Sequence, residues 1–444
     1  MPAQPVARTP SRRAKLLVVL LSVLFALLVG EIGLRLVGYT YPVFYTTDEA
    51  RGYALRPCMR GWYRKEGATY VEINCAGLRD REHARAKPPN TLRVAVVGDS
   101  YAEALQVQQA DAFWAVMERQ LRACPALGGR AVEVINFGVS GYGTAQELIT
   151  LEQEVWAYAP DVVLLAVTTN NDITDNARAL KRTDEIPYFV LRDGRLVLDD
   201  SFRTSRAFVL RNSLLNRAGR WLRDNLRVIQ AAHQAQHALK TRLDARRARA
   251  RQQAQAQNAP AAEQAPTTPG ADTQPAAEQA PAPQAAAQGE ELGADNLVYR
   301  PPTDPVWQDA WRVTEALILR MRDEVNAHGA RLVVVTLSNG IQVYPDAQAR
   351  QAFMQKVGAT DLFYPDLRVK ALCDGAGVPV VTLAPQLQRY ADEHKTFLHG
   401  FPPDLGNGHW NENGHRLAGQ LLAQKLCDWL APGGGANAEG GTPR

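Results

Sequence analysis

The chain has 444 residues, of which 46% are hydrophobic and 22% are charged. This composition is typical of a globular protein with one large domain or two ordinary ones. The formal net charge is only +4, so the charge gives no support for a nucleic-acid partner.

A long apolar segment lies near the N-terminus. No charged residue falls between Leu16 and Gly30, and the apolar character continues past Glu31 and Arg35. At about 1.5 Å per residue, a helix of this length crosses a bilayer core of roughly 30 Å. We therefore expect a transmembrane anchor at 16–38.

The charges before this segment predict its orientation. Four basic residues lie in the tail 1–15, namely Arg8, Arg12, Arg13 and Lys15. Because Lys and Arg stay on the cytoplasmic side, we expect a single-pass protein of the inner (cytoplasmic) membrane with its main domain in the periplasm. A cleaved signal peptide is the alternative, but no A-x-A-like site follows the apolar run. Either interpretation exports the rest of the chain.

The chain has five cysteines, and export permits disulfides. Cys58 and Cys75 lie close together in a segment rich in turns and β-formers, which makes them the favoured pair. The alternative is that all five are unpaired thiols. None of them has metal-ligand spacing, so we expect no metal site.

A juxtamembrane segment spans 39–90 and holds short β-like runs such as Thr69 to Ile73. A regular alternation of strands and helices follows in 91–185. The predicted strands are Leu92–Val97, Val132–Asn136 and Val162–Val167, and the predicted helices are Ala112–Leu121 and Ala145–Tyr158. Such alternation, with continuous Val, Ile and Leu runs, indicates a parallel sheet covered on both faces.

This pattern is interrupted between 186 and 298. Residues 200–257 are rich in Arg, Ala, Gln and Leu, and we expect a basic insertion of one or two helices over 186–257. Its basic end, from Arg242 to Arg251, is a solvated helix face or, alternatively, a contact with anionic envelope lipid or polymer. Residues 258–298 have almost no aliphatic bulk, so we expect a disordered Ala/Pro/Gln linker.

Regular structure resumes at Pro305 and ends before a tail, 433–444, that we expect to be disordered. The predicted helices are Trp307–Asn326, Asp366–Asp374 and Asn413–Leu430, and the predicted strands are Arg331–Thr336 and Val378–Leu383. Segments 91–185 and 299–432 thus give five strands with helices between them. We expect one three-layer α/β/α domain with a five-stranded parallel sheet, interrupted by the insertion.

Ligands of an open parallel sheet bind beyond the carboxyl ends of its strands. The candidates there are Ser100 after Gly98-Asp99, the glycine-rich turn Gly138 to Gly143, Asn171 in an Asn-Asn-Asp run, and His409 with His415 in the last loop. A serine becomes a nucleophile when a base accepts its proton, and a histidine is such a base near neutral pH. Turn N–H groups and an Asn amide can hold the oxyanion of acyl transfer.

Each candidate also has a purely structural explanation. Ser100 alone is more typical of a helix N-cap, and the glycines are typical of plain turns. Asn171 and its neighbours could simply cap the next helix. His409 could be a histidine packed in a loop, and this explanation is stronger for His415. Only the conjunction of four such loops at one sheet edge favours catalysis.

The four loops together resemble the four blocks of the SGNH (GDSL-like) hydrolase family, in a membrane-anchored bacterial member. The blocks, in chain order, are VAVVGDSYAE, INFGVSGYGTAQE, TTNNDI and GHWNENGHRLAG. The resemblance covers about 91–185 and 300–431 and implies a flavodoxin-like serine esterase. It implies Ser100 as nucleophile, His409 rather than His415 as base, and Ser100, Gly141 and Asn171 as the oxyanion hole. No phosphate loop or dinucleotide fingerprint occurs, so we expect no cofactor.

Two positions depart from the family pattern. Tyr101 replaces the Leu of the GDSL name, at a position without chemistry. The family's Asp three residues before the histidine is Gly406 here, and Asn407 stands two residues before. Asp404, five residues before His409, is the nearest acid. Three arrangements stay open: Asp404 reaches the imidazole, a backbone carbonyl orients it, or the site works as a dyad.

We expect an esterase or deacylase that acts through an acyl-serine intermediate on a carbohydrate-linked ester of the cell envelope. The substrate class is implied by the resemblance, because several anchored relatives are thought to act on envelope polysaccharides. One alternative is an O-acetyltransferase of an envelope polysaccharide, in which a sugar hydroxyl replaces water. Another is a catalytically inactive scaffold that binds glycan.

Overall fold

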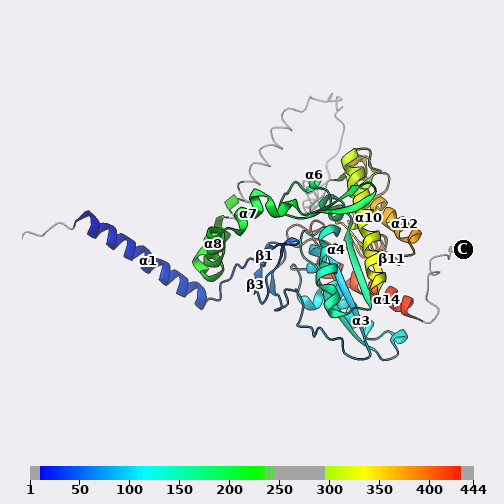
Figure 1. Ribbon diagram of the computed structural model, residues 1–444, viewed down its shortest axis with the longest axis horizontal. Coiled ribbons are helices and arrows are strands. Elements are labelled where there is room, and N and C mark those ends of the chain that lie inside the picture. The colour runs from blue at the N-terminus through cyan, green and yellow to red at the C-terminus, as the bar shows by residue number, and fades with distance from the viewer. Residues whose placement is uncertain (1–10, 237–238, 241–242, 244–295, 432–444) are drawn as a thin grey trace, which may run out of the picture. The chain divides into compact units, whose positions relative to one another are not determined.

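The computed structural model of the protein describes residues 11–236, 239–240, 243 and 296–431 (Figure 1). They fall in two compact units, one made of 44–213 with 286–444 and the other of 1–43 with 214–285. The basic run from Arg242 to Arg251 and the tail 433–444 lie outside the described residues, Leu243 excepted. So does the linker 258–298, apart from 296–298, which begin a short 3-10 helix (Asn296–Tyr299).

A five-stranded parallel sheet forms the centre of the larger unit. Its strands are β5 (Thr91–Gly98), β6 (Ala131–Asn136), β7 (Val162–Thr168), β10 (Arg331–Leu337) and β11 (Val380–Thr382). The order across the sheet is β11-β10-β7-β5-β6, and every neighbouring pair is parallel. This is the strand order of flavodoxin-like folds. The predicted fold class is confirmed.

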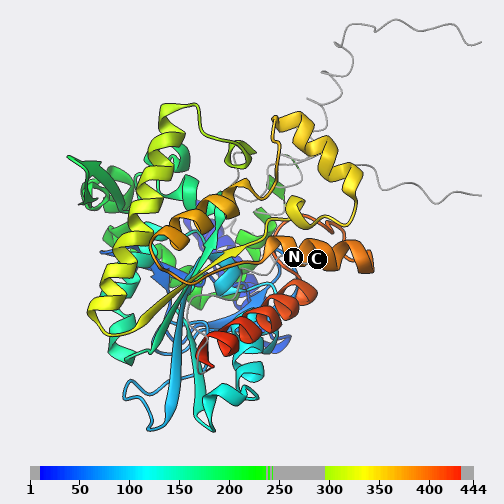
Figure 2. The same ribbon diagram turned by 90° about the vertical axis from the view of Figure 1, so that its right-hand side faces the viewer.

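Helices cover both faces of this sheet, as Figure 2 shows for α10 and α14. Alternate residues of β5 point to opposite faces: Val94 and Val96 belong to one apolar core, Ala95 and Val97 to the other. The first core is covered by α3 (Phe113–Leu121), α13 (Ala384–His394) and α14 (Glu412–Leu430). The second core is covered by α4 (Thr144–Gln153), α10 (Pro305–Ala327) and α12 (Tyr364–Gly375).

The helix expected at Ala145–Tyr158 is shorter in the structure. Helix α4 ends at Gln153, and a 3-10 turn (Val155–Tyr158) replaces its predicted last turn. Glu154 leaves the helical conformation with φ −123°, and its carboxylate lies 2.7 Å from the guanidinium of Arg51. The ion pair and the buried Val155 therefore override the local helical spacing.

Several short elements complete the larger unit. The helices are α2 (Ser100–Glu103), α5 (Thr169–Asp175), α6 (Arg178–Lys181), α7 (Arg206–Asn212) and α11 (Ala347–Val357). Strands β8 (Tyr188–Arg192) and β9 (Arg195–Asp199) form an antiparallel hairpin. This hairpin lies at the start of the region that the sequence predicted to be helical, so that prediction is wrong for 188–199.

Two antiparallel hairpins precede the sheet along the chain. Strand β1 (Tyr45–Asp48) pairs with β2 (Gly52–Leu55), and β3 (Arg60–Tyr63) pairs with β4 (Thr69–Glu72). They share a small apolar core made of Phe44, Leu55, Val71, Ile73, Leu105, Val139 and Tyr142. Because Val139 and Tyr142 belong to the glycine-rich turn, this core holds the hairpins against the carboxyl edge of the sheet.

The larger unit contains two disulfides. One joins Cys58 to Cys75, the favoured pair, and fastens the turn after β2 to the end of β4. The other joins Cys124 to Cys427 across 303 residues of sequence and was not predicted. It links the segment after α3 to α14. Cys373 is a buried free thiol.

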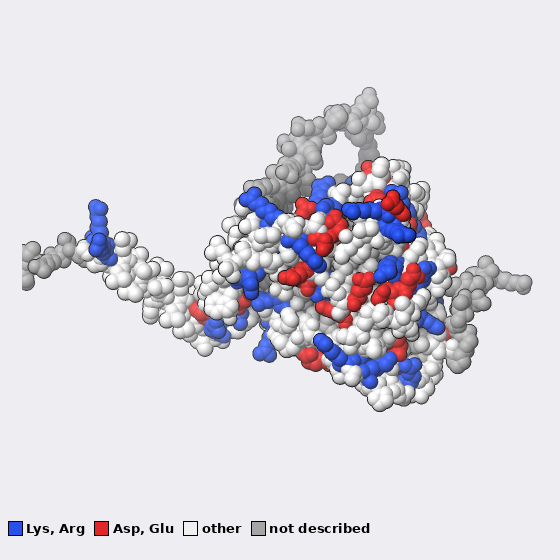
Figure 3. Space-filling view, viewed as in Figure 1, with Lys and Arg blue, Asp and Glu red and all other residues white. Residues whose placement is uncertain are grey.

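The smaller unit contains α1 (Arg12–Leu36) and α8 (Leu214–Asn225). Helix α1 has 25 residues, none of them buried, and is long and apolar enough to cross a membrane. Its length is about 37 Å at 1.5 Å per residue. Figure 3 shows an uncharged surface along α1 between its basic start and the charged residues of its last turns.

Candidate active site

Strand β5 ends at Gly98, where the chain turns sharply into α2. A side chain at Gly98 would lie 3.0 Å from Cβ of Ala102 and 3.1 Å from Cβ of Ala166, so only glycine fits without a shift of its neighbours. The carboxylate of Asp99 then caps α2 by accepting the N–H of Tyr101 at 2.9 Å. Ser100 is consequently the first residue of the helix and lies at the carboxyl edge of the sheet, 7% exposed.

His409 lies beside this turn. Its ring centroid is 5.1 Å from that of Tyr101. Burial raises the pKa of Asp99, and the charge of His409 is among the groups that oppose this rise. His409 therefore interacts with both sequence neighbours of Ser100.

Glu66 provides the carboxylate that contacts His409. Its Oε2 is 2.5 Å from Nδ1 of the imidazole, and its Oε1 accepts the backbone N–H of His409 at 2.7 Å. Burial alone would raise the pKa of Glu66, but the hydrogen bond and charge of His409 outweigh it and lower that pKa. Glu66 is thus held ionised and accepts a hydrogen bond from Nδ1 of His409. Nε2, on the other side of the imidazole ring, does not take part in this contact.

Glu66 reaches this position from the turn between β3 and β4. A side chain at Gly408 would lie 2.2 Å from Oε1 of Glu66, so a glycine before His409 is needed for this approach. In the same turn, Gly67 has φ +69° and packs against the carbonyl of Gln106. The β3–β4 hairpin is therefore shaped to bring a carboxylate to the imidazole.

Asp404, the acid nearest to His409 in the sequence, lies elsewhere. It is exposed, and its backbone N–H donates to the carbonyl of Phe401 at 2.8 Å within a turn. The contact with Nδ1 belongs to Glu66, which is 343 residues from His409 and outside the segments that resemble the hydrolase blocks. The sequence signal for Glu66 was weak: a carboxylate before Gly67, in a turn that precedes a β-like run.

His415 and His399 are buried and packed. Burial lowers the pKa of His415 to about 3, and its Nδ1 accepts the backbone N–H of Phe113 at 3.2 Å. Burial also lowers the pKa of His399 to about 4, and its Nδ1 lies 2.8 Å from the carbonyl of Gly408. Both imidazoles are therefore neutral at pH 7, and His399 supports the loop that carries His409.

Two hydrogen bonds, one at the N–H and one at the carbonyl of Ser140, hold the glycine-rich turn in place. The backbone N–H of Ser140 donates to Oε2 of Glu103 at 2.8 Å, and its carbonyl accepts the hydroxyl of Tyr53 at 2.8 Å. Because the carbonyl of Ser140 and the N–H of Gly141 belong to one planar peptide, they point in opposite directions. Tyr53, on β2, thus fixes the direction of the Gly141 N–H.

Gly141 itself has no room for a side chain. Its φ is +77°, and a Cβ would lie 2.7 Å from the hydroxyl oxygen of Tyr53. The backbone of Tyr53 is in turn fixed, since its carbonyl accepts the hydroxyl of Tyr142 at 2.5 Å. The β1–β2 hairpin and the glycine-rich turn therefore hold each other in place.

Asn171 lies on α5 and is 8% exposed. Its Nδ2 donates to Oδ2 of Asp99 at 2.9 Å, which orients the amide beside the turn that carries Ser100. An amide nitrogen carries two N–H groups, so a second donor remains on the same atom. The structure thus brings Ser100, Asn171, His409 and the turn with Gly141 to one edge of the sheet.

Buried acids lie behind this edge. Burial raises the pKa of Asp172 well above its ordinary value, with the charge of Asp99 adding to the effect. Burial and the charge of Asp172 likewise raise the pKa of Glu147, on α4. Among the described residues, neither carboxylate oxygen of Glu147 has a hydrogen-bond partner. Burial without a hydrogen-bond partner therefore disfavours the charged form of Glu147.

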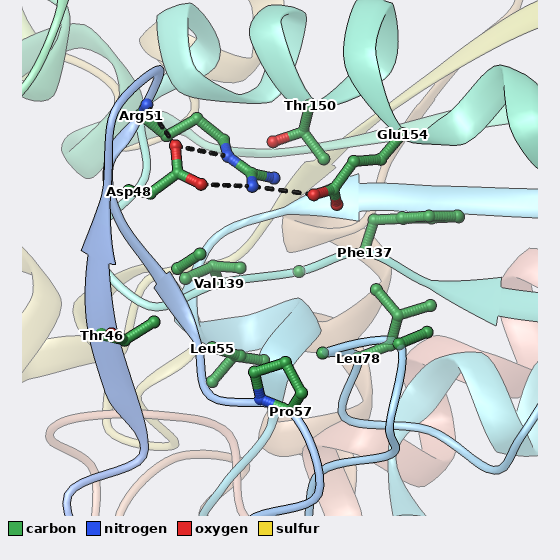
Figure 4. A pocket seen from close by; sticks show the side chains of 14 residues that line it. Thr46, Asp48, Arg51, Leu55, Pro57, Leu78, Phe137, Val139, Thr150 and Glu154 are labelled. Atoms are coloured by element: carbon green, nitrogen blue, oxygen red, sulfur yellow. Dashed lines mark hydrogen bonds and ion pairs between the residues drawn. The ribbon is translucent and has the colours of Figure 1, made fainter.

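A cavity of about 190 Å³ opens beside the β1–β2 hairpin (Figure 4). At one end Arg51 lies between the carboxylates of Asp48, at 2.8 Å, and Glu154, at 2.7 Å. The other end is lined by the apolar side chains of Leu55, Pro57, Leu78, Phe137 and Val139. Arg51 is already paired with both acids, and neither Ser100 nor His409 lines the cavity, so we assign it no part in the candidate site.

Comparison of the sequence with protein-family models and with curated proteins gives no match. Among solved structures, an acetylxylan esterase from Geobacillus stearothermophilus is similar at 12% identity and TM-score 0.33, over 78% of this chain and 97% of that chain. The acetyl xylan esterase AlAXEase has 11% identity and TM-score 0.35, over 75% and 99%.

A third similar structure is LAE5, an alpha/beta hydrolase enzyme from the metagenome of Lake Arreo, Spain. It has 13% identity and TM-score 0.33, over 76% of this chain and 95% of that chain. Similarity at this level carries no argument about this chain. The fold stated above rests on its own strand order.

Proposed function

We propose that this chain is a serine ester hydrolase in which Ser100 is the nucleophile and His409 its general base. The observation that carries the proposal is the carboxylate of Glu66 on Nδ1 of His409, beside the turn that presents Ser100. An acid, an imidazole and a serine at one sheet edge form the arrangement that acyl transfer uses. Glu66 replaces Asp404 as the proposed orienting acid.

In the proposed acylation step, Oγ of Ser100 attacks the ester carbonyl while Nε2 of His409 takes the hydroxyl proton. Glu66 keeps the proton on Nδ1 and stabilises the imidazolium that forms. The tetrahedral intermediate collapses, the C–O bond to the alcohol breaks, and His409 returns the proton to the leaving oxygen. Water then attacks the acyl-serine by the same route and releases the acid.

The oxyanion hole in this proposal is made of the N–H groups of Ser100 and Gly141 and the amide of Asn171. Two of these groups are held by neighbours: Gly141 through Tyr53, and Asn171 through Asp99. Donors that are fixed in advance stabilise developing charge without reorganisation, which is a large part of catalysis in such sites.

We propose a carbohydrate-linked ester of the cell envelope as the substrate. The support is the resemblance of the four loops to SGNH hydrolases, together with α1, which is long and apolar enough to anchor the chain in a membrane. Two disulfides fit an exported domain, because such bonds persist in oxidising compartments. The proposed location is the periplasmic face of the inner membrane, with the N-terminus in the cytoplasm.

The test is hydrolysis of p-nitrophenyl acetate by the full chain in detergent micelles. We expect release of acetate by the native chain and loss of about 10³-fold or more in Ser100→Ala and His409→Asn. Ser201→Ala, at an exposed serine after β9, is the matched control and should keep native activity. Equal activity of Ser100→Ala and the native chain would sink the proposal.

The same assay separates hydrolysis from transfer to a sugar. With an oligosaccharide acceptor present, a hydrolase still releases free acetate, whereas an O-acetyltransferase yields acetylated oligosaccharide. Mass spectrometry of the acceptor after the reaction distinguishes the two products. We expect the acceptor mass to stay unchanged.

A further inference from the structure

Helix α8, in the smaller unit, has two chemically different sides. At 3.6 residues per turn, Leu214, Leu215 and Leu222 fall on one side together with Trp221. The opposite side carries Arg217, Arg220, Arg223 and Asp224. Three arginines and one aspartate leave this side with a net charge of +2.

The apolar side of α8 is exposed. Leu214 is 81% exposed, Leu215 86% and Trp221 62%. A Cβ at Gly219, which lies at the border of this side next to Leu215, would meet no atom within 4 Å. A contiguous exposed surface of this kind marks a site of interaction with a protein or a membrane.

Hydrogen bonds within the smaller unit tie the end of α8 to the last turns of α1. Arg35 donates through Nη2 to the carbonyl of Asn225 at 2.7 Å, and Glu31 accepts the backbone N–H of Val228 at 3.0 Å. Glu31 and Arg35 also pair with each other at 2.7 Å. The backbone N–H of Tyr41, after α1, donates to the side chain of Gln230 at 2.9 Å.

If α1 spans the membrane, these hydrogen bonds determine how deep α8 lies in the bilayer. The apolar stretch of α1 begins after Lys15 and ends at Glu31, so Glu31 and Arg35 mark its boundary with the far interface. The groups that bind them, Asn225 and Val228, are then at the same level. An amphipathic helix placed there lies where headgroups meet acyl chains.

We propose that α8 lies in the outer interface of the bilayer, with its apolar side in the acyl boundary and its arginines among anionic headgroups. The proposal rests on the membrane anchoring by α1 proposed above. Its occupant is an anionic phospholipid surface because the opposite side of α8 is cationic, because Trp and Leu suit this depth, and because α8 is bonded to the end of the anchor. The helix fixes the membrane-proximal end of the insertion at the bilayer.

The test uses single spin labels on the full chain in vesicles of phosphatidylglycerol and phosphatidylcholine. Cys373→Ser removes the free thiol, and labels are then placed one at a time by Leu215→Cys, Arg217→Cys and Leu24→Cys. Collision rates with oxygen, which concentrates in the bilayer, are compared with those of a water-soluble nickel complex. Leu215 and Arg217 lie on opposite sides of α8, so each is the matched control of the other.

We expect oxygen collisions to dominate at 215, nickel collisions to dominate at 217, and oxygen collisions to dominate at 24. Nickel access at 215 equal to that at 217, with the label at 24 still in the bilayer, would overturn the proposal and leave the anchor intact. So would protection of 215 from both reagents, which would indicate that a protein surface, such as a second copy, covers this side. Nickel access at 24 would overturn the anchor and the proposal together.

Discussion

Glu66 and His409 form the contact on which the proposed mechanism depends most. Glu66→Gln keeps the size of the side chain but removes the charge that stabilises the imidazolium, so we expect kcat to fall by roughly 10³ to 10⁴-fold with little change in KM. Steady-state kinetics on p-nitrophenyl acetate measure both quantities. Asp404→Asn is the matched control, because Asp404 is the acid that the sequence indicated, and it should stay within about twofold of the native rate. The reverse ranking of the two variants would restore Asp404 as the orienting acid.

Tyr53 is a positioning residue in this proposal, since it acts on the oxyanion through the peptide of Ser140 and Gly141. Tyr53→Phe removes only the hydroxyl, and we expect kcat to fall about tenfold with KM unchanged, less than the loss of about 10² to 10³-fold for a direct oxyanion donor. Tyr70→Phe, at a residue 40% exposed on β4, is the control and should be neutral. A change in KM alone would contradict the assigned role.

At the scale of single residues, the sequence predicted what short motifs specify. Ser100, Gly141 and Asn171 come after strands β5, β6 and β7, and His409 lies in the loop between α13 and α14. The structure gathers these loops at one edge of the sheet. Glu66 and Tyr53 could not be found in this way, because each reaches the site from a hairpin. Their contacts depend on how hairpins at 45–55 and 60–72 pack on the sheet. No local pattern records that packing.

Helix α4 carries an acid whose burial links stability to pH. Because burial, and then the charge of Asp172, raise the pKa of Glu147 above its ordinary 4.5, the folded chain keeps a proton that the unfolded chain loses. The contribution of Glu147 to the free energy of unfolding is fully present below pH 4.5. It is lost as the pH rises through the pKa of the folded state. We expect Glu147→Gln to unfold at a higher temperature than the native chain at pH 8, and the difference to shrink at pH 5.

Thermal unfolding of both chains between pH 5 and 8 measures this difference. Asp172 keeps its own raised pKa in the variant, so the slope of stability with pH is reduced and not abolished. Asp361→Asn is a control at a carboxyl outside this cluster. An identical pH slope in native chain and Glu147→Gln would show that Glu147 is ionised in the folded state.

At the scale of elements, the buried strands were the easiest to predict. Every residue of β5 and of β7 is buried, and their apolar runs, which only Arg93 of β5 interrupts, leave little ambiguity. The β8–β9 hairpin was missed although its two apolar strands flank Asp193-Gly194, a typical hairpin turn, because the arginine-rich segment that follows it dominates the composition of this region. Helix α8 lies within the insertion that was predicted to be helical. Only the structure shows that its apolar side is exposed and that its end is hydrogen-bonded to the last turns of α1.

Across the whole chain, the disulfide between Cys124 and Cys427 joins segments 303 residues apart. A cross-link that closes so long a loop restricts the unfolded chain, and we expect the paired variant Cys124→Ser with Cys427→Ser to lose about 2–4 kcal/mol of stability. Denaturant unfolding followed by the intrinsic fluorescence of tryptophan measures the loss. Cys373→Ser, at the buried free thiol, is the control for serine substitution. Equal stability of the native chain and the paired variant would contradict a structural role for this bond.

The larger unit also shows why a resemblance confined to 91–185 and 300–431 was incomplete. Those segments contain the sheet and the four loops, but the proposed acid, Glu66, and one support of the glycine-rich turn, Tyr53, come from 44–78. The N-terminal hairpins are therefore part of the candidate site and more than a connection between α1 and the sheet. Their core, which includes Leu105, Val139 and Tyr142, explains the coupling physically.

The nucleophile can be identified by covalent labelling of the full chain with a fluorophosphonate, followed by peptide mapping. A serine activated by His409 and Glu66 attacks phosphorus, its proton passes to His409, and the P–F bond breaks with loss of fluoride. The phosphonyl group stays on Oγ and adds its mass to one peptide. We predict the adduct on the peptide that contains Ser100, together with slower labelling of Glu66→Gln. An adduct at another serine, or none on the folded native chain, would contradict the proposal that Ser100 is the catalytic nucleophile.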